Sequence, residues 1–175
     1  MNPDLRYPIG KNVPVEDPTE AQRREFIAAI AEAPARLAAA VTGLTPAQLD
    51  TPYRPSGWTV RQVAHHLADS HMNGFVRFKL ALTEDEPTIK PYDEARWAEL
   101  PDAKLAIEPS LALLDNLHTR WVVLLRALTP ADFARKFTHP EVGKISLDDY
   151  LQEYAWHGRH HVAHITSLRE RNGWR

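Results

Sequence analysis

The sequence carries its clearest signal at residues 154–164, which read Tyr154-Ala155-Trp156-His157-Gly158-Arg159-His160-His161-Val162-Ala163-His164. His160 and His164 are four residues apart, so on a helix both imidazoles project from one face, one turn above the other. Two neutral imidazoles at this spacing can bind one divalent metal ion. A second histidine cluster, at residues 65–71, could supply a third ligand. We therefore interpret the chain as a helical bundle that binds a metal ion and leaves one coordination position open.

The composition is that of an ordinary globular protein. The 175 residues are enough for one domain with a full core, and we expect residues 1–175 to form a single domain. The net charge is -2 and no basic run exceeds Arg23-Arg24, which argues against a nucleic-acid partner. No apolar run approaches the roughly 20 residues of a membrane span, and the N-terminus does not resemble a secretory signal, so we expect a cytoplasmic protein without a membrane partner. Cysteine is absent, which excludes thiolate ligands and a cysteine nucleophile.

Hydrophobic periodicity predicts four amphipathic helices. We expect them at about residues 19–41, 59–82, 109–128 and 146–171. Pro34 lies inside the first of these and should bend or split it. Prolines at positions 3, 8, 14 and 18 predict that residues 1–18 form an extended arm on the surface.

The connections between these helices differ in kind. Residues 83–108 are punctuated by proline, and so long a connection in a compact domain is usually functional or covers one face of the bundle. With Tyr92 and Trp97 it could shape a pocket or a dimer contact. Residues 136–145 predict a small β-hairpin immediately before the last helix. The expected fold is therefore an all-α four-helix bundle with a long connection between its second and third helices.

A helical projection of the last helix places its histidines relative to the core. The apolar stripe consists of Leu147, Leu151, Tyr154, Gly158, His161, Ile165 and Leu168. At about 100° per residue, His157 and His164 lie within roughly 60° of this stripe and His160 lies about 100° away. On the second helix His66 flanks the apolar stripe, and His71 lies within it as a possible core histidine. Periodicity alone does not choose among the histidines of this helix for the third ligand.

The residues also resemble a known family, the DinB/YfiT superfamily, and within it the metal-dependent hydrolases of the YfiT type. The matching segments run nearly from end to end: residues 6–10 (RYPIG), 49–54 (LDTPYR), 57–73 (GWTVRQVAHHLADSHMN), 90–93 (KPYD) and 156–164 (WHGRHHVAH). The resemblance implies a four-helix bundle, often dimeric, that binds zinc or nickel through three histidines. It therefore implies one Zn²⁺ or Ni²⁺ ion per subunit and a homodimer.

The resemblance also assigns the ligands. The first is the histidine directly before leucine in the second helix, which here is His66. The other two form an H-x3-H pair on the last helix, taken here as His160 and His164. His118 and His139 are left as ordinary histidines, and His65 and His157 as surface groups or groups that support a ligand.

Three imidazoles leave one position of a tetrahedral ion open for water, as in catalytic zinc sites. The ion lowers the pKa of that water to about 7, which predicts a metal-dependent hydrolase acting on a small-molecule electrophile. The same position could instead accept a low-molecular-weight thiol such as bacillithiol or mycothiol, as in thiol S-transferases of the superfamily. A metal-binding scaffold without catalytic activity is the third hypothesis.

The sequence names no general base. Glu153 lies seven residues before His160 on the same side of the last helix, and either Glu153 or His157 could orient an imidazole by hydrogen bonding. Asp69 lies three residues after His66 and could act in the same way. The alternative is that these carboxylates are simply solvated.

Overall fold

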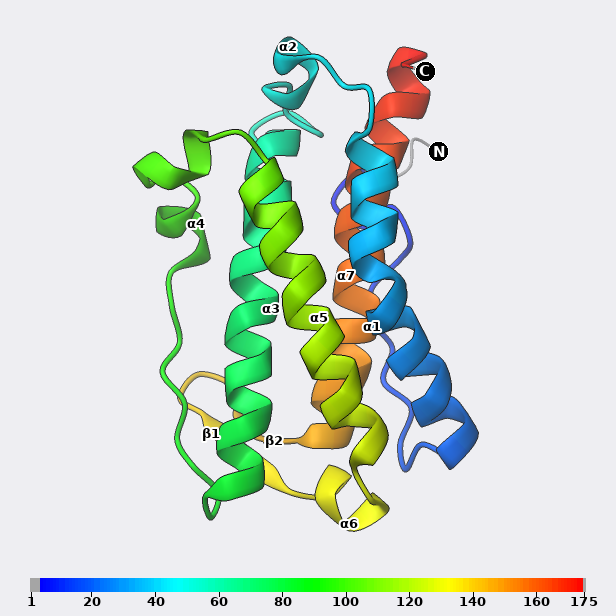
Figure 1. The fold of residues 1–175 in the computed structure, drawn as a ribbon, viewed down its shortest axis with the longest axis vertical. Coiled ribbons are helices and arrows are strands. Elements are labelled where there is room, and N and C mark those ends of the chain that lie inside the picture. The colour runs from blue at the N-terminus through cyan, green and yellow to red at the C-terminus, as the bar shows by residue number, and fades with distance from the viewer. Residues whose placement is uncertain (1–3, 175) are drawn as a thin grey trace.

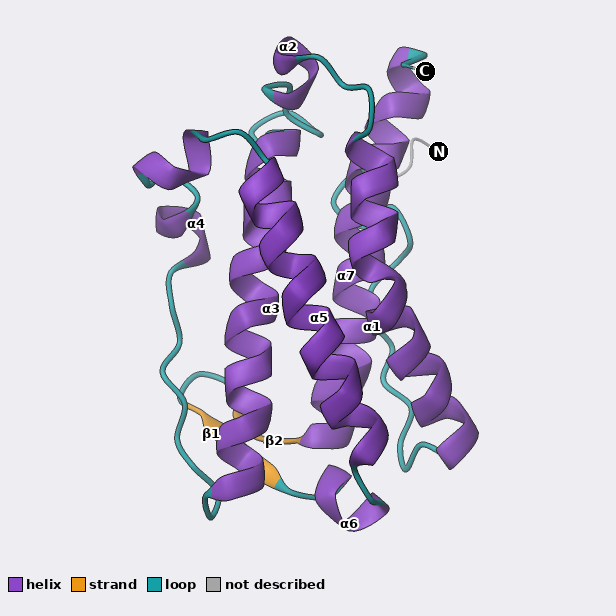
Figure 2. Ribbon diagram, in the orientation of Figure 1, coloured by secondary structure: helices purple, strands orange, loops and turns teal. Residues whose placement is uncertain are grey.

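The structure is a computed structural model that describes residues 4–174, and its main elements are four long helices (Figures 1 and 2). These are α1 (Glu20–Val41), α3 (Val60–Thr83), α5 (Glu108–Ala127) and α7 (Leu147–Asn172). The shorter elements are α2 (Pro46–Leu49), α4 (Glu94–Trp97), the 3-10 helix η1 (Pro101–Lys104), α6 (Pro130–Phe133), β1 (Lys136–His139) and β2 (Gly143–Ser146). The predicted four-helix bundle and its β-hairpin are confirmed. Among the residues described, no helix combines the length and the apolarity that crossing a bilayer requires.

The order of the helices explains the long connection. Figure 1 shows α1 and α7 running in one direction along the bundle and α3 and α5 in the other. Because α3 and α5 are parallel neighbours, residues 84–107 must return along the full length of the bundle before α5 can begin. On the way this segment touches the hairpin, where Thr88 pairs with Thr138, and then forms α4 and η1 beside α3.

Local sequence sets the helix starts. Thr19 and Thr59 are the N-cap residues of α1 and α3. The hydroxyl of each threonine accepts a hydrogen bond from the backbone N–H of a glutamine three residues later. The side chain of that glutamine in turn accepts from the backbone N–H of the threonine. Pro34 does not split α1, which continues through it to Val41. The cost of that proline is one missing backbone donor inside the helix.

The interior consists of two apolar clusters separated by a polar layer. The cluster near the hairpin includes Ile30, Phe78, Trp121, Phe137 and Leu151, and the cluster near α2 includes Leu37, Val63, Leu67, Leu114 and Ile165. Between them, the helices α3, α5 and α7 contribute the buried histidines His71, His118 and His161 and the half-buried His157. A buried polar layer is stable only if its groups are satisfied, so the partners of these imidazoles are informative.

Gly74 on α3 allows two aromatic side chains to pack against the helix backbone. A Cβ atom at this position would lie 2.5 Å from Tyr154 Cζ and 2.9 Å from Trp121 Cη2. We expect Gly74→Ala to lower the free energy of unfolding by about 2 kcal/mol, because overpacking costs up to about 3 kcal/mol and the gain in helix propensity returns about 1 kcal/mol. Urea denaturation measures this loss.

Gly158→Ala is the matched comparison for that measurement. Its Cβ would meet the Ala33 side chain at 3.1 Å, a milder contact, so we expect a smaller loss. Equal or greater stability of Gly74→Ala relative to the parent would contradict the packing described here.

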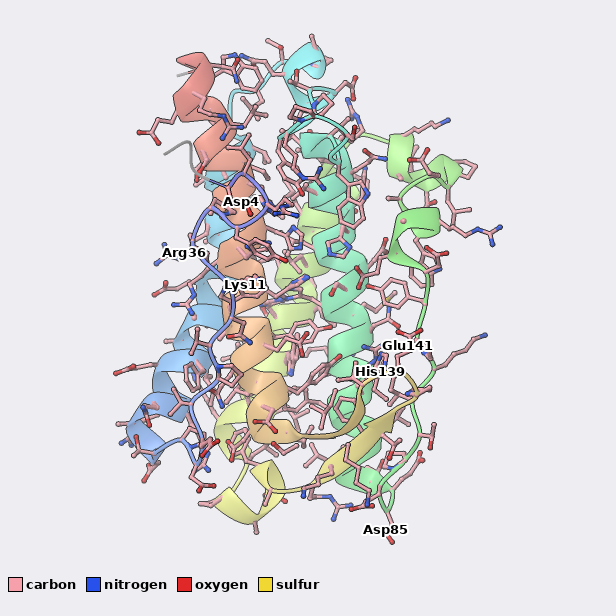
Figure 3. All side chains as sticks on the ribbon, turned by 180° about the vertical axis from the view of Figure 1, so that it is seen from behind. Asp4, Lys11, Arg36, Asp85, His139 and Glu141 are labelled. Atoms are coloured by element: carbon pink, nitrogen blue, oxygen red, sulfur yellow. The ribbon has the colours of Figure 1, made fainter. Side chains whose placement is uncertain are left out.

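The described part of the N-terminal arm, residues 4–18, contains no helix and lies along α7, as the positions of Asp4 and Lys11 show in Figure 3. Hydrogen bonds to side chains of α7 hold it there. The Val15 backbone N–H donates to Gln152 Oε1 at 2.8 Å, and Trp156 Nε1 donates to the Gly10 carbonyl at 3.2 Å. Residues 1–3 of the predicted arm lie outside the described residues.

Candidate metal centre

Three histidines from two neighbouring helices meet at the polar layer. His66 comes from α3, and His157 and His161 come from successive turns of α7. Each offers one ring nitrogen, and these three atoms lie within 4.8 Å of one another. His66 Nε2 and His157 Nε2 are 3.3 Å apart. Two imidazole nitrogens bound to one zinc ion at 2.0–2.1 Å in tetrahedral geometry lie about 3.4 Å apart, so this spacing fits a shared metal ion.

The charge state of the three imidazoles also suits a metal. Desolvation by burial lowers the pKa of His66 to about 4, and burial places the pKa values of His157 and His161 well below the ordinary value. Neutral imidazole is the form that coordinates a cation. The Nδ1 atom of His161 is also buried without a hydrogen-bond partner among the described residues, as are those of His160 and His164.

The other predicted pair does not join His66. The ring nitrogens of His66, His160 and His164 do not form a group within 4.8 Å in the described part of the chain. Instead, the His164 Nε2–H donates to the Arg6 carbonyl at 3.2 Å, and its ring stacks on Tyr53 with centroids 4.0 Å apart. His160 stacks on Trp156 at 4.1 Å. These two histidines therefore pack beside the N-terminal arm, although their Nδ1 atoms are likewise unpartnered.

The two histidine pairs of α7 face different directions for a simple geometric reason. Residues 157–164 contain the H-x3-H spacing twice, as His157/His161 and as His160/His164. The two pairs differ by three residues, or about 60° of helix rotation. His161 lies on the core stripe of α7, so the first pair faces the bundle interior and α3. The projection of α7 already placed His161 there, and this signal could have identified the pair.

The predicted supporting carboxylates do not orient an imidazole. Neither Glu153 nor Asp69 forms a side-chain hydrogen bond with a histidine among the residues described. Burial raises the pKa of the Asp69 carboxyl group. The imidazole of His157 is instead held by another histidine, because His157 Nδ1 lies 3.2 Å from His71 Nε2. His71 Nδ1 in turn lies 2.8 Å from His118 Nε2. Sequence reasoning missed His118 because an isolated histidine on an apolar helix carries no pattern.

His65, which directly precedes a candidate ligand, takes no part in the cluster. Its Nδ1 atom lies 2.7 Å from the Ser110 hydroxyl and its Nε2 atom 3.3 Å from the Leu105 carbonyl. It therefore fastens α3 to the beginning of α5 and to the segment before it. This contrast between adjacent histidines follows from the 100° step of the helix, which turns His66 toward α7 and His65 toward α5.

A tryptophan separates the cluster from an open cleft. The Trp58 ring lies 4.6 Å from His66 and 6.3 Å from His161, measured between centroids. Trp58 also lines a cleft of about 1080 Å³ between residues 56–62 and 93–100. Gln62 and Trp97 line both this cleft and a water-sized cavity beside His66. A small molecule in the cleft would thus be close to the histidines.

Known proteins resemble this chain over nearly its full length. A Bacillus mycoides protein named "Putative metal-dependent hydrolase" is 58% identical over 171 residues, which cover 98% of this chain and 99% of that protein. A Bacillus cereus protein with the same description is 56% identical over the same extent. The solved structure of Bacillus subtilis YfiT, described as a "probable metal-dependent hydrolase with an unusual four-helix bundle topology", is 54% identical with a TM-score of 0.95. It covers 98% of this chain and 99% of its own.

A more distant structure supports the fold alone. The four-helix bundle protein TT2238 is 24% identical, with a TM-score of 0.58 over 80% of this chain and 94% of its own. The model of the DinB superfamily matches residues 29–165, which include all four long helices in whole or in large part and every histidine of the cluster. From the family match and the full-length relatives together, we conclude that this chain belongs to the DinB superfamily.

Proposed function

We propose that this protein is a metal-dependent hydrolase whose ligands are His66, His157 and His161. The observation that carries the proposal is the convergence of three neutral imidazoles from two helices within 4.8 Å, next to an open cleft. Imidazole ligands suit zinc and nickel, which are the ions we expect. The names of the relatives, which describe metal-dependent hydrolases, support the same class of activity.

The protein's own residues would bind the metal ion, orient the substrate and exclude water from the site. His66, His157 and His161 would hold the ion through three ring nitrogens and would leave it able to bind water or substrate. When bound, a divalent ion supplies Lewis acidity at this site, which activates a nucleophile and polarises an electrophile. The Trp58 ring shields two of the ligands from solvent, and Trp97 and Gln62 line the approach to them. We therefore propose a small-molecule ester, amide or similar electrophile as substrate.

The test is a screen of activated esters and amides with protein that has been stripped of metal and reloaded with zinc or nickel. We expect turnover without an added thiol, loss of turnover after chelation and recovery on reloading. Turnover that begins only when a low-molecular-weight thiol is added would replace hydrolysis by thiol transfer. Metal-loaded protein that is silent under both conditions would contradict an enzymatic role and leave a metal-binding scaffold.

Trp58→Phe is a useful companion variant in this screen. It keeps an aromatic ring against His66 but reduces the surface that shields the ligands.

The homodimer predicted from the resemblance stays a prediction, and measuring the mass of the reloaded protein in solution tests it.

A further inference from the structure

The polar layer begins at a backbone carbonyl that α1 cannot satisfy by itself. Pro34 has no backbone N–H, so the carbonyl four residues earlier, that of Ile30, lacks its usual helical donor. His118 Nδ1 lies 2.7 Å from this oxygen. A carbonyl oxygen only accepts hydrogen bonds, so His118 must carry a proton on Nδ1. The proline in α1 and the histidine in α5 thus form one matched pair.

The direction of this first hydrogen bond determines the next two. Burial lowers the pKa of His118 to about 4, so the ring is neutral and its Nε2 atom is an acceptor. The donor to it, at 2.8 Å, is therefore His71 Nδ1. Because a neutral imidazole has one ring proton and His71 places it on Nδ1, its Nε2 atom accepts from His157 Nδ1 at 3.2 Å. In this series of three imidazoles, which we call the imidazole chain, every hydrogen bond is donated in the direction of the Ile30 carbonyl.

We propose that His71 and His118 are positioning residues that hold His157 in the Nδ1–H tautomer, so that its Nε2 lone pair faces His66 and a metal ion. The part of this proposal that concerns metal affinity rests on the proposed function. The proton position of His157 does not, because it follows from hydrogen bonds that exist without a metal. A ligand histidine is commonly oriented by a hydrogen bond to a carboxylate or a carbonyl. Here His71 and His118 connect His157 to the Ile30 carbonyl through a series of hydrogen bonds.

The chain of imidazoles is a support and not a path for protons. It ends at the carbonyl of Ile30, whose residue is 0% exposed, and a carbonyl has no proton to pass on. Aromatic rings enclose the chain: His71 packs edge-on against Trp121 and Tyr154, with ring centroids 5.9 and 5.0 Å away. In such an enclosed setting an unpaired nitrogen is costly, so a change of tautomer in one ring forces its neighbour to respond.

The direct test is a long-range ¹H–¹⁵N NMR spectrum of the metal-free parent protein at neutral pH, with histidine signals assigned by single substitutions. We expect His118, His71 and His157 to be neutral and to carry their protons on Nδ1, the tautomer that an unconstrained histidine disfavours. A proton on Nε2 of His157 would overturn the proposal. This measurement needs neither a metal nor a substrate.

The second test compares three variants in a zinc titration against a competing chelator. His118→Phe removes the acceptor for His71, so we expect a dissociation constant about 10- to 100-fold higher. His118→Gln places an amide oxygen near the former Nε2 position and should restore most of the affinity. His65→Phe replaces another buried histidine, which lies beside His66 but makes no hydrogen bond to His71, His118 or His157, and should bind zinc as the parent does.

These outcomes separate support from general damage. Equal weakening in His118→Phe and His118→Gln, or in His65→Phe and His118→Phe, would contradict a role through hydrogen bonding. The NMR spectrum keeps the proposal testable even where a variant folds poorly. If the parent shows the expected tautomers but binds no metal, the proposed function fails and the hydrogen-bonded arrangement stands. If it binds metal with His157 protonated on Nε2, only the present proposal fails.

Discussion

Replacing His161 by alanine is expected to reduce the metal content of reloaded protein from one ion per chain to nearly none. The variant loses one of three nitrogens that converge within 4.8 Å, and the remaining two come from different helices. Removing even a group that merely supports a ligand typically costs 10- to 100-fold in metal affinity, so the loss of a ligand should exceed about 100-fold. Metal analysis after gel filtration measures this effect.

His160→Ala is the matched control for that experiment. The two residues are adjacent on α7, both are buried, and each has an Nδ1 atom without a partner among the described residues. The control should keep its metal, because His160 packs on Trp156 beside the arm and away from His66. If His160→Ala were depleted of metal and His161→Ala were not, the ligands would be the other H-x3-H pair.

The same pair of variants should differ in stability when metal is present. A ligand that binds only the folded protein stabilises it by about 4 kcal/mol at 1,000 times its dissociation constant. We therefore expect zinc to raise the unfolding midpoint of the parent and of His160→Ala, and to leave that of His161→Ala nearly unchanged. This readout is independent of catalysis.

Metal-free protein is expected to lose stability steeply between pH 6.5 and pH 4. Burial lowers the pKa of His118 to about 4 in the folded state, while the unfolded chain has the ordinary value of 6.5. The unfolded state therefore binds more protons in this window, so the free energy of unfolding falls as the pH falls. At pH 5 this single residue removes about 2 kcal/mol.

His118 does not act alone in this window. Desolvation also lowers the pKa of His66 to about 4 and holds those of His71 and His161 well below the usual range. A second proton on His71 would also remove the acceptor that His71 Nε2 provides for His157 Nδ1. Each of these groups binds a proton more readily in the unfolded chain, so each adds to the loss, and we expect the metal-free protein to unfold in mild acid.

Urea denaturation at pH 7.5, 6.0 and 5.0 in the presence of a chelator measures this dependence. In His118→Phe the fall in stability between pH 7.5 and pH 5.0 should be smaller by about 2 kcal/mol, because one proton-binding group has been removed. A free energy of unfolding that stays constant over this range would show that these histidines are not held neutral by the fold.

Much of the architecture could be predicted from local pattern. The capping residues Thr19 and Thr59 and the apolar periodicity placed the long helices within a few residues, because these signals act over one or two turns. The β-hairpin before α7 was equally local. The resemblance to a known family then selected His66, which the structure brings to α7.

By itself, therefore, the sequence determined the helices, the bundle and a histidine-rich centre between α3 and α7. Only the tertiary structure decided which H-x3-H pair faces His66, because the two pairs differ by about 60° on one helix and the choice depends on how α7 is rotated against its neighbours. The support of His157 also depended on packing. Pro34, His118 and His71 lie on three different helices, and no spacing along the chain shows that a carbonyl freed by a proline will meet an imidazole from across the core.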